Sequence, residues 1–562
     1  MQKYISAILI YLYCQTLTLA QKTDTALLKE VNTIFKTYDN LKTPGVAVGF
    51  IQNGELIFSK GYGMADLEHN IPINTKSVFS LASVSKQFTV FAVLLLEEQG
   101  RLSLDDDIKK YLPHFPNYNK IITLRQLAAH TSGLKSHGHL LGQKGYTPDN
   151  VITKNDVLNV IYKQDALNFK PGEEFNYSNS GYVLLAEIVE KVSGKPFSIY
   201  LEEQIFSPLE MSDSFVMDDY HKIVLNRANS YEIDNGTYVN APANYSYYGS
   251  TGLYSTLLDL SKWALNFANP KIGSQSIFEK MNTLSQLNSG NTFGYALGQF
   301  VDNYNGLEYI HHAGGEAGYR AFLGRFPETN SAVLLLSNNS AIDAQGLALQ
   351  VVNIFLKKKF KLTNKTSSVD QRQFKKVKLS REYLEKYSGL YLNQKTYITR
   401  NIFVRNDTLI YARPEQNNRE TPLYPLEKES TFQLGDYPDL KIEFSTKINE
   451  KYMRVLENNQ IVDFYEPYSP KVYKAKELEC FTGSYYSKNL DTTYELSVIN
   501  GNLTITHPKL GEIRLSSIKK DGFLASSWQF RFLEFERNTQ DEITGFAITS
   551  DRVRNTRFQK LK

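Results

Sequence analysis

The fold is decided by a stretch near residue 80 that reads Phe79-Ser80-Leu81-Ala82-Ser83-Val84-Ser85-Lys86-Gln87-Phe88-Thr89 and runs on into apolar residues 90–96 before Gly100. Small polar residues at its start and a glycine at its end predict a helix with Ser83 at the N-terminus. In a helix, Ser83 and Lys86 share one face, which places the ammonium about 3 Å from the hydroxyl. Free N–H groups at a helix N-terminus also favour negative charge developing nearby. Ser83 is therefore a candidate nucleophile.

The Ser-x-x-Lys pattern alone is a weak signal. It occurs twice more, at Ser516 with Lys519 and at Ser517 with Lys520. Those two pairs lie in a strand-like stretch, where residues three apart point to opposite faces. The structural alternative for Ser83 itself is a helix-capping serine beside a solvated lysine. Other motifs must decide between the two interpretations.

Composition describes a globular protein of several domains. The 562 residues are 42% apolar and 22% charged, and roughly two to four domains are expected at this length. The net charge of +4 is small for the length, so no nucleic-acid partner is indicated. The 37 tyrosines and 32 phenylalanines favour a large share of β-strand.

The N-terminus has the pattern of a secretory signal. Lys3 precedes a short apolar run over 5–13, and small residues end at Ala20 before a polar stretch. We expect cleavage after Ala20 and export to a bacterial periplasm or beyond. The alternative is an uncleaved anchor, but the run is short for a bilayer span, and no later segment approaches one. Cys14 lies inside the signal, so the mature chain keeps Cys480 alone and has no internal disulfide.

The first part of the chain predicts an α+β domain. An amphipathic helix is expected over 25–38, and Asn53-Gly54 between two apolar runs predicts a β-hairpin. A loop follows to about residue 150. Further helices are expected near 155–163, 180–193, 196–206, 256–268 and 342–358, and strands near 294–301, 307–312, 318–326 and 331–337. Strands from both ends with helices between them favour an antiparallel sheet.

The last part of the chain contains a repeat. Tyr387-Ser388-Gly389-Leu390-Tyr391 is echoed by Phe481-Thr482-Gly483-Ser484-Tyr485, and 407–411 is echoed by 501–505. Both echoes have the same offset, 94 residues (483 − 389 and 503 − 409). Two similar all-β units therefore follow a Lys-, Thr- and Ser-rich linker.

Two more motifs suit a catalytic cleft. A Pro171-Gly172 turn leads to Tyr177-Ser178-Asn179 on a loop just before a helix, where side chains project from the scaffold. A tyrosinate near a lysine ammonium is a reasonable base, because the positive charge lowers the pKa of the phenol from about 10. The alternative is a packed tyrosine beside an asparagine that caps its own loop. Further on, an apolar strand ends in His312-Ala313-Gly314-Gly315, where glycines allow close approach of the backbone.

The three motifs, in this order, resemble those of serine hydrolases related to class C β-lactamases and DD-peptidases. The resemblance covers about residues 25–360, and 127–134, 171–173 and 252–260 also match it. The tail resembles the lipocalin-like barrels of D-aminopeptidases in that family. We therefore expect a signal peptide over 1–20, an α+β hydrolase domain with a helical subdomain over 21–360, a linker over 361–380, and two barrel-like domains over 381–470 and 471–562.

The resemblance also implies roles. Ser83 would form an acyl-enzyme, Lys86 would accept or hold its proton, and Tyr177 would act as general base or relay. The backbone N–H groups of Ser83 and Gly315 would form the oxyanion hole, commonly worth ~3 kcal/mol per donor. The expected substrate-binding residues are Asn179, His312, Gly314 and Gly315. No metal or other cofactor is expected.

Two departures shape the functional prediction. Relatives that bind a free carboxylate usually carry a threonine hydroxyl where this chain has Ala313, and His312 is not reliably charged near neutral pH. We therefore expect a secreted peptidase, amidase or esterase acting on a small molecule or peptide, with Arg320 as a possible source of carboxylate-directed charge. The alternatives are a β-lactamase and a non-catalytic protein that binds penicillin or senses peptides.

Other hydrolase classes fit less well. No Gly-x-Ser-x-Gly elbow of a Ser-His-Asp esterase occurs in the chain. His137-Gly138-His139 is a weak zinc signal without the His-Glu-x-x-His pattern.

Overall fold

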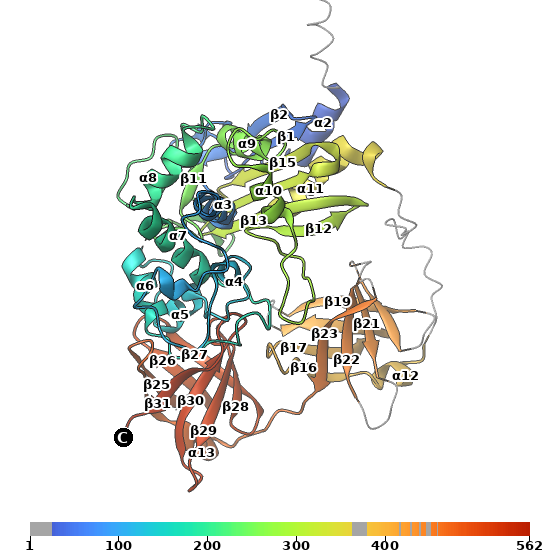
Figure 1. The fold of residues 1–562 in the computed structure, drawn as a ribbon. Helices are drawn as coiled ribbons and strands as arrows, with labels where there is room; N and C mark the ends of the chain where they lie inside the picture. Colours follow the sequence, from blue (N-terminus) through green and yellow to red (C-terminus); the bar gives the residue numbers. More distant parts are fainter. Residues whose placement is uncertain are drawn as a thin grey trace, which may run out of the picture. The chain divides into compact units, whose positions relative to one another are not determined.

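The computed structural model describes residues 25–361, 379–414, 418–426, 430–435, 437, 440–445, 451–457 and 459–562. The chain divides into two compact units (Figure 1). The first contains residues up to 134, 148–162 and 169–362, and the second contains 135–147, 163–168 and 363–562. The expected signal peptide and most of the expected linker lie outside the described residues. No described helix has the length and apolar character needed to span a bilayer.

The first unit is built on a six-stranded antiparallel sheet in the order β12-β13-β14-β15-β1-β2. Asn53 and Gly54 have φ of 51° and 81° and make the predicted tight turn between the first two strands in sequence. The chain termini of the unit thus meet in one sheet, as the sequence predicts. The strands are β1 (Val46–Gln52), β2 (Glu55–Tyr62), β12 (Phe300–Tyr304), β13 (Leu307–Glu316), β14 (Tyr319–Phe326) and β15 (Ser331–Ser337).

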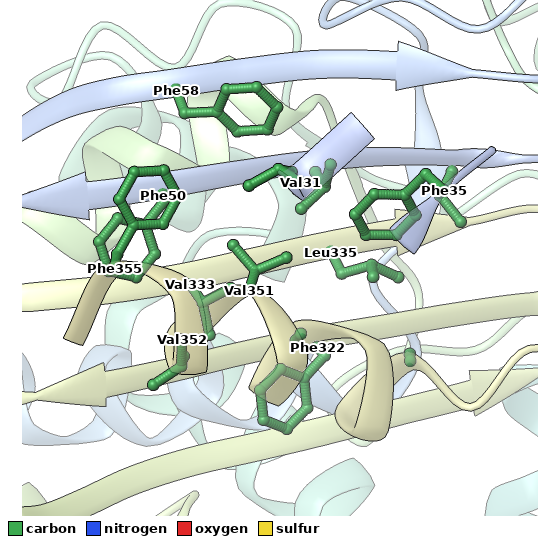
Figure 2. Packing of buried hydrophobic residues seen from close by; sticks show 14 of the residues in the cluster. Val31, Phe35, Phe50, Phe58, Phe322, Val333, Leu335, Val351, Val352 and Phe355 are labelled. Atoms are coloured by element: carbon green, nitrogen blue, oxygen red, sulfur yellow. The ribbon is translucent and has the colours of Figure 1, made fainter. Parts of the chain in front are cut away.

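Helices cover both faces of this sheet. On one face α2 (Thr25–Ile34) and α11 (Ala344–Leu356) pack against the strands, and Figure 2 shows Val31, Val351 and Phe355 among the strand side chains. Phe50 stacks on Phe355 with ring centroids 4.3 Å apart. Its neighbour Gly49 points to the other face, where a Cβ would lie 3.5 Å from Leu257 of α9 (Leu257–Asn266). Strand β1 is buried almost throughout because both faces are covered.

Several other helices of the first unit pack around the buried helix α3 (Ser85–Glu98). Phe88 stacks on Trp263 of α9 at 4.2 Å, and α3 also packs against α7 (Asn179–Ser193) and α10 (Gln275–Asn282). The helices expected at 155–163 and 196–206 are present as α6 (Lys154–Tyr162), α8 (Phe197–Leu201) and a π-helical turn over Glu202–Phe206. The strand predicted near 294–301 was placed too early, since β12 begins at Phe300.

The second unit contains two closed eight-stranded barrels, β16 to β23 and β24 to β31. Their strands run from Gly389–Leu392 to Gln460–Pro467 and from Gly483–Ser487 to Thr556–Lys560. The repeat appears in the side chains: the Tyr391 hydroxyl donates to the Tyr387 carbonyl at 2.9 Å, and the Tyr485 hydroxyl donates to the Phe481 carbonyl at 2.7 Å. The aromatic pairs Phe432–Phe444 and Phe523–Phe535 also have matching edge-to-face geometry. The fold class predicted from the sequence is confirmed.

Two short segments from the middle of the chain belong to the second unit. The stretch predicted as a loop to about residue 150 contains a helix, α5 (His137–Gln143), which the sequence analysis missed. His139 Nε2 lies 2.8 Å from Asp551 Oδ1, and Gln143 donates to the Gln529 carbonyl at 2.7 Å. The helix contains two glycines and is stabilised by these contacts with the second barrel, so local propensity did not reveal it.

Candidate active site

Ser83 lies at the turn where a short strand becomes a buried helix. Strand β5 (Phe79–Ser80) leads into a 3₁₀ turn (Ala82–Val84), and α3 begins at Ser85. Ala82 has φ of 45°, a conformation that costs energy for a residue with a side chain and often occurs at functional sites. Ser83 is partly exposed, although the residues on either side of it are buried. The strained turn thus leaves one hydroxyl partly accessible between buried neighbours.

Lys86 is the nearest charged partner of this hydroxyl. Its side chain is fully buried, and Nζ donates to Ser83 Oγ at 3.1 Å and to the Ser250 carbonyl at 2.7 Å. Nζ also lies 5.0 Å from the centre of the Tyr177 ring. The structure therefore brings Ser83, Lys86 and Tyr177 together from two distant segments.

Tyr177 lies on the loop before α7 and packs against His130. The two rings are 4.1 Å apart, and the Ser178 N–H donates to His130 Nδ1 at 3.1 Å. His130 Nδ1 lies 3.1 Å from the Ser178 carbonyl oxygen as well, and Nε2 lies 3.2 Å from the Tyr295 hydroxyl, so both ring nitrogens have polar partners. Sequence analysis noticed His130 only as part of a supporting phrase, and its position behind Tyr177 depends on the tertiary fold.

His312 closes the site from strand β13. Its Nδ1 donates to the Ala313 carbonyl at 2.6 Å, which leaves Nε2 to accept from the Tyr177 hydroxyl at 3.4 Å. Burial, with the nearby Lys86 charge, lowers the pKa of His312 to about 3. His312 is therefore neutral at pH 7 and adds no positive charge to the site.

Strand β13 has a free edge beside Ser83. Its pairing with β12 ends at His311, whereas its pairing with β14 continues to Glu316. A Cβ on Gly314 would lie 3.1 Å from Ser83 N and 2.4 Å from the Leu81 carbonyl oxygen. The glycine is needed for this close approach of two backbones.

The other predicted residues lie in the same unit. Asn179 is the first residue of α7, two positions after Tyr177, and it is partly buried. Gly315 is exposed on β13, opposite Arg320 on β14. Arg320 donates to the Ala317 and Tyr319 carbonyls at 3.0 and 2.7 Å and so stabilises the hairpin turn. Among the described residues, no three His, Cys, Asp or Glu side chains gather as a metal site.

Sequence analysis also missed Glu316, the last residue of β13. Glu316 Oε2 accepts from Thr251 Oγ1 at 2.6 Å and from Ser80 Oγ at 2.9 Å. Burial raises the pKa of this carboxyl, and the two hydrogen bonds and the Lys86 charge oppose that effect. No short motif in the sequence distinguishes Glu316 from an ordinary surface glutamate at a strand end.

This fold and this arrangement of serine, lysine and tyrosine define a serine hydrolase of the β-lactamase and transpeptidase superfamily. The chain belongs to the Beta-lactamase family, whose sequence profile matches residues 31–351.

Named relatives and solved structures agree with this assignment. Protein flp of Staphylococcus aureus (strain MRSA252) is 31% identical over 306 residues, which are 52% of this chain and 59% of that protein. The putative penicillin-binding protein PbpX of Bacillus subtilis is 33% identical over 51% of this chain and 69% of its own length. The octameric penicillin-binding protein homologue of Pyrococcus abyssi has a TM-score of 0.55 at 25% identity, over 79% of this chain and all of that one. The D-amino acid amidase of Ochrobactrum anthropi shares the fold, with a TM-score of 0.51 at 22% identity, over 59% of this chain and 99% of that one.

Proposed function

We propose that the protein hydrolyses small amides, peptides or esters through an acyl-enzyme on Ser83. The observation that carries this proposal is the 3.1 Å hydrogen bond from buried Lys86 to the partly exposed Ser83 hydroxyl. A nucleophile needs an adjacent group to accept its proton, and the Lys86 and Tyr177 pair is placed to do so.

The reaction follows from this geometry. Ser83 Oγ attacks the substrate carbonyl carbon as its proton passes to the Lys86 and Tyr177 pair, a step that uses the form of the pair in which one member has already lost a proton, either Lys86 as the neutral amine or Tyr177 as the phenolate. The pair returns the proton to the leaving nitrogen or oxygen and later takes one from the water that hydrolyses the ester. Neutral His312 accepts a hydrogen bond from the Tyr177 hydroxyl and so orients the phenol. Backbone N–H groups at Ser83 and on the free edge of β13 would stabilise the oxyanion.

The site offers few positively charged groups for a substrate carboxylate, which favours amidase, peptidase or esterase activity over dedicated β-lactamase activity. His312 is neutral, Ala313 has no hydroxyl, and Arg320 is hydrogen-bonded to its own hairpin. A free carboxylate, which penicillins carry, therefore has few dedicated partners among the described residues of this cleft. The fold shared with a D-amino acid amidase is consistent with this preference.

A four-substrate comparison tests the proposal. A D-amino acid amide, a D-Ala-D-Ala peptide, a p-nitrophenyl ester and nitrocefin are offered to the wild type and to Ser83→Ala. We expect turnover of the amide or the ester that depends on Ser83, with nitrocefin slower by at least about tenfold. Fastest turnover of nitrocefin would favour a β-lactamase. A stable penicillin adduct without turnover of any substrate would favour the penicillin-binding alternative suggested by the names of two relatives.

We also propose that the protein is exported and that cleavage after Ala20 leaves Gln21 as the first residue of the mature chain. The motivation is the signal pattern of residues 1–20. An intact mass that retains these residues would contradict it.

A further inference from the structure

Glu316 lies on the face of β13 that runs past the nucleophile. Successive residues of a strand alternate between its faces, so His312, Gly314 and Glu316 point the same way. Gly314 meets the backbone of Ser83, and Glu316 follows about 7 Å further along the strand. Its carboxylate therefore lies on the same face of the strand as the contact with Ser83, and Ser80, three residues before the nucleophile, donates to it.

One oxygen of the Glu316 carboxylate accepts two hydrogen bonds from the protein, and the other oxygen has no donor among the residues that the structure describes. Both hydrogen bonds, from Thr251 and Ser80, end on Oε2. The side chain is partly exposed, and no described lysine or arginine forms an ion pair with it. Lys86 acts on it through space only, since its ammonium is hydrogen-bonded to Ser83 and Ser250. A carboxylate that is partly removed from water and has no cationic partner carries a desolvation cost, and a cation from outside would reduce that cost.

Two tyrosines lie on the segment that leads to Thr251, the hydrogen-bond donor to Glu316. Tyr245 and Tyr247 are partly exposed, and their ring centroids are 5.6 Å apart. The Tyr247 carbonyl would lie 2.7 Å from a Cβ on Gly252, which follows the Thr251 that donates to Glu316. Burial raises the pKa of both phenols, and the Glu316 charge adds to this effect. Carboxylates and tyrosine faces are the groups that bind organic ammonium ions in proteins.

Space for a substrate adjoins this group. Tyr254 and Tyr319 line a pocket of about 400 Å³ together with Asn244 and Arg227. Tyr319 pairs with Glu316 at the end of the β13–β14 hairpin, and Tyr254 pairs with Ser80, whose hydroxyl donates to Glu316 at 2.9 Å. Two of the residues that line the pocket are therefore strand neighbours of Glu316 and of its partner Ser80.

We infer that Glu316, with Tyr245 and Tyr247, binds a free ammonium group on the acyl side of the scissile bond. The preferred substrates would then be amides or short peptides of an amino acid whose amine is unblocked. This inference rests on the proposed function and adds the feature of the substrate that the site selects.

Turnover of three matched amides tests the inference. D-alanine, N-acetyl-D-alanine and propionic acid, each as its fluorogenic aminomethylcoumarin amide, are compared at pH 7. We expect the wild type to prefer the free amine by about tenfold to a hundredfold in kcat/KM. In Glu316→Gln that preference disappears, and turnover of the propionyl amide changes by less than about threefold. Glu308→Gln is the matched control, because Glu308 is an exposed glutamate on the same strand.

Two results would overturn the inference. One is equal turnover of the amine and its blocked analogue by the wild type. The other is an equal loss on all three amides in Glu316→Gln, which would mean that Glu316 only holds Ser80 and Thr251 in place.

A binding measurement separates this inference from the proposed function. In Ser83→Ala, calorimetry should detect D-phenylalanine amide binding at least about tenfold more tightly than 3-phenylpropionamide, and Glu316→Gln should remove the difference. Equal affinities would reject the ammonium site whether or not the protein is a catalyst. Absence of Ser83-dependent turnover with preferential amine binding would reject the proposed function and leave the ammonium site standing.

Discussion

Gly314 lies against the backbone of Ser83 so closely that a single methyl group would not fit. A Cβ at position 314 would come within 2.4 Å of the Leu81 carbonyl oxygen and 3.1 Å of Ser83 N. We predict that Gly314→Ala moves β13 away from the nucleophile and lowers kcat/KM by at least about a hundredfold, because small displacements in an active site are expensive. Circular dichroism should show a retained fold.

Gly315→Ala is the control for that substitution. A Cβ there would meet Arg320 at 3.6 Å, an ordinary contact, and the backbone N–H is kept. Activity should stay within about fivefold of the wild type. Similar losses in both variants would contradict the account of Gly314.

His130 should position Tyr177 without touching the substrate. His130→Ala removes the ring nitrogen that contacts the Ser178 backbone at 3.1 Å, a loss of about 1–3 kcal/mol. We expect kcat to fall about tenfold to a hundredfold with a smaller change in KM. His130→Asn offers an oxygen near the place of Nδ1 and should recover part of kcat. If both variants lose stability equally and neither differs in kcat, His130 is only a core residue.

His312 should stay neutral across the physiological pH range. Its folded pKa of about 3 lies below the unfolded value of 6.5, so its contribution to stability is complete above pH 6.5 and is lost as the pH falls. The loss between pH 7 and pH 5 is about 2 kcal/mol. Nitrogen-15 NMR of labelled histidine, assigned with His312→Gln, should show the Nδ1–H tautomer throughout pH 5–8. A titration in that range would contradict the neutral His312.

Sequence patterns predicted the parts of the fold that depend on local chemistry. Asn53-Gly54 specifies its turn by itself, and the echo between Gly389 and Gly483 corresponds to the first strand of each barrel. Helix α5 was missed because its glycines lower helix propensity and its stability comes from residues about 400 positions away, such as Asp551.

The candidate site likewise contains residues that local motifs predict and residues that only the tertiary fold identifies. Ser83, Lys86, Tyr177 and His312 belong to short motifs, and the structure places them together. Glu316 and the stacking of His130 on Tyr177 depend on contacts between strands and loops far apart in sequence. No residue pattern within a few positions reports such contacts.

The repeated tyrosine contact should stabilise each barrel separately. Tyr391→Phe and Tyr485→Phe each remove one buried hydroxyl bond to a carbonyl, which should cost ~1 kcal/mol. Hydrogen exchange followed by mass spectrometry should show faster opening in the mutated barrel alone. Tyr486→Phe is the control, because its hydroxyl donates to the exposed Asp491; it should leave the exchange rates of both barrels unchanged.

The central claim is that Ser83, activated by Lys86, is the nucleophile. Intact-mass measurement of fluorophosphonate labelling tests it most directly, with Ser516→Ala as control because Ser516 heads another Ser-x-x-Lys pattern. We predict one adduct on the wild type and on Ser516→Ala, none on Ser83→Ala, and labelling slowed by at least about a hundredfold in Lys86→Ala. An adduct that persists in Ser83→Ala, or an unchanged rate in Lys86→Ala, would contradict it.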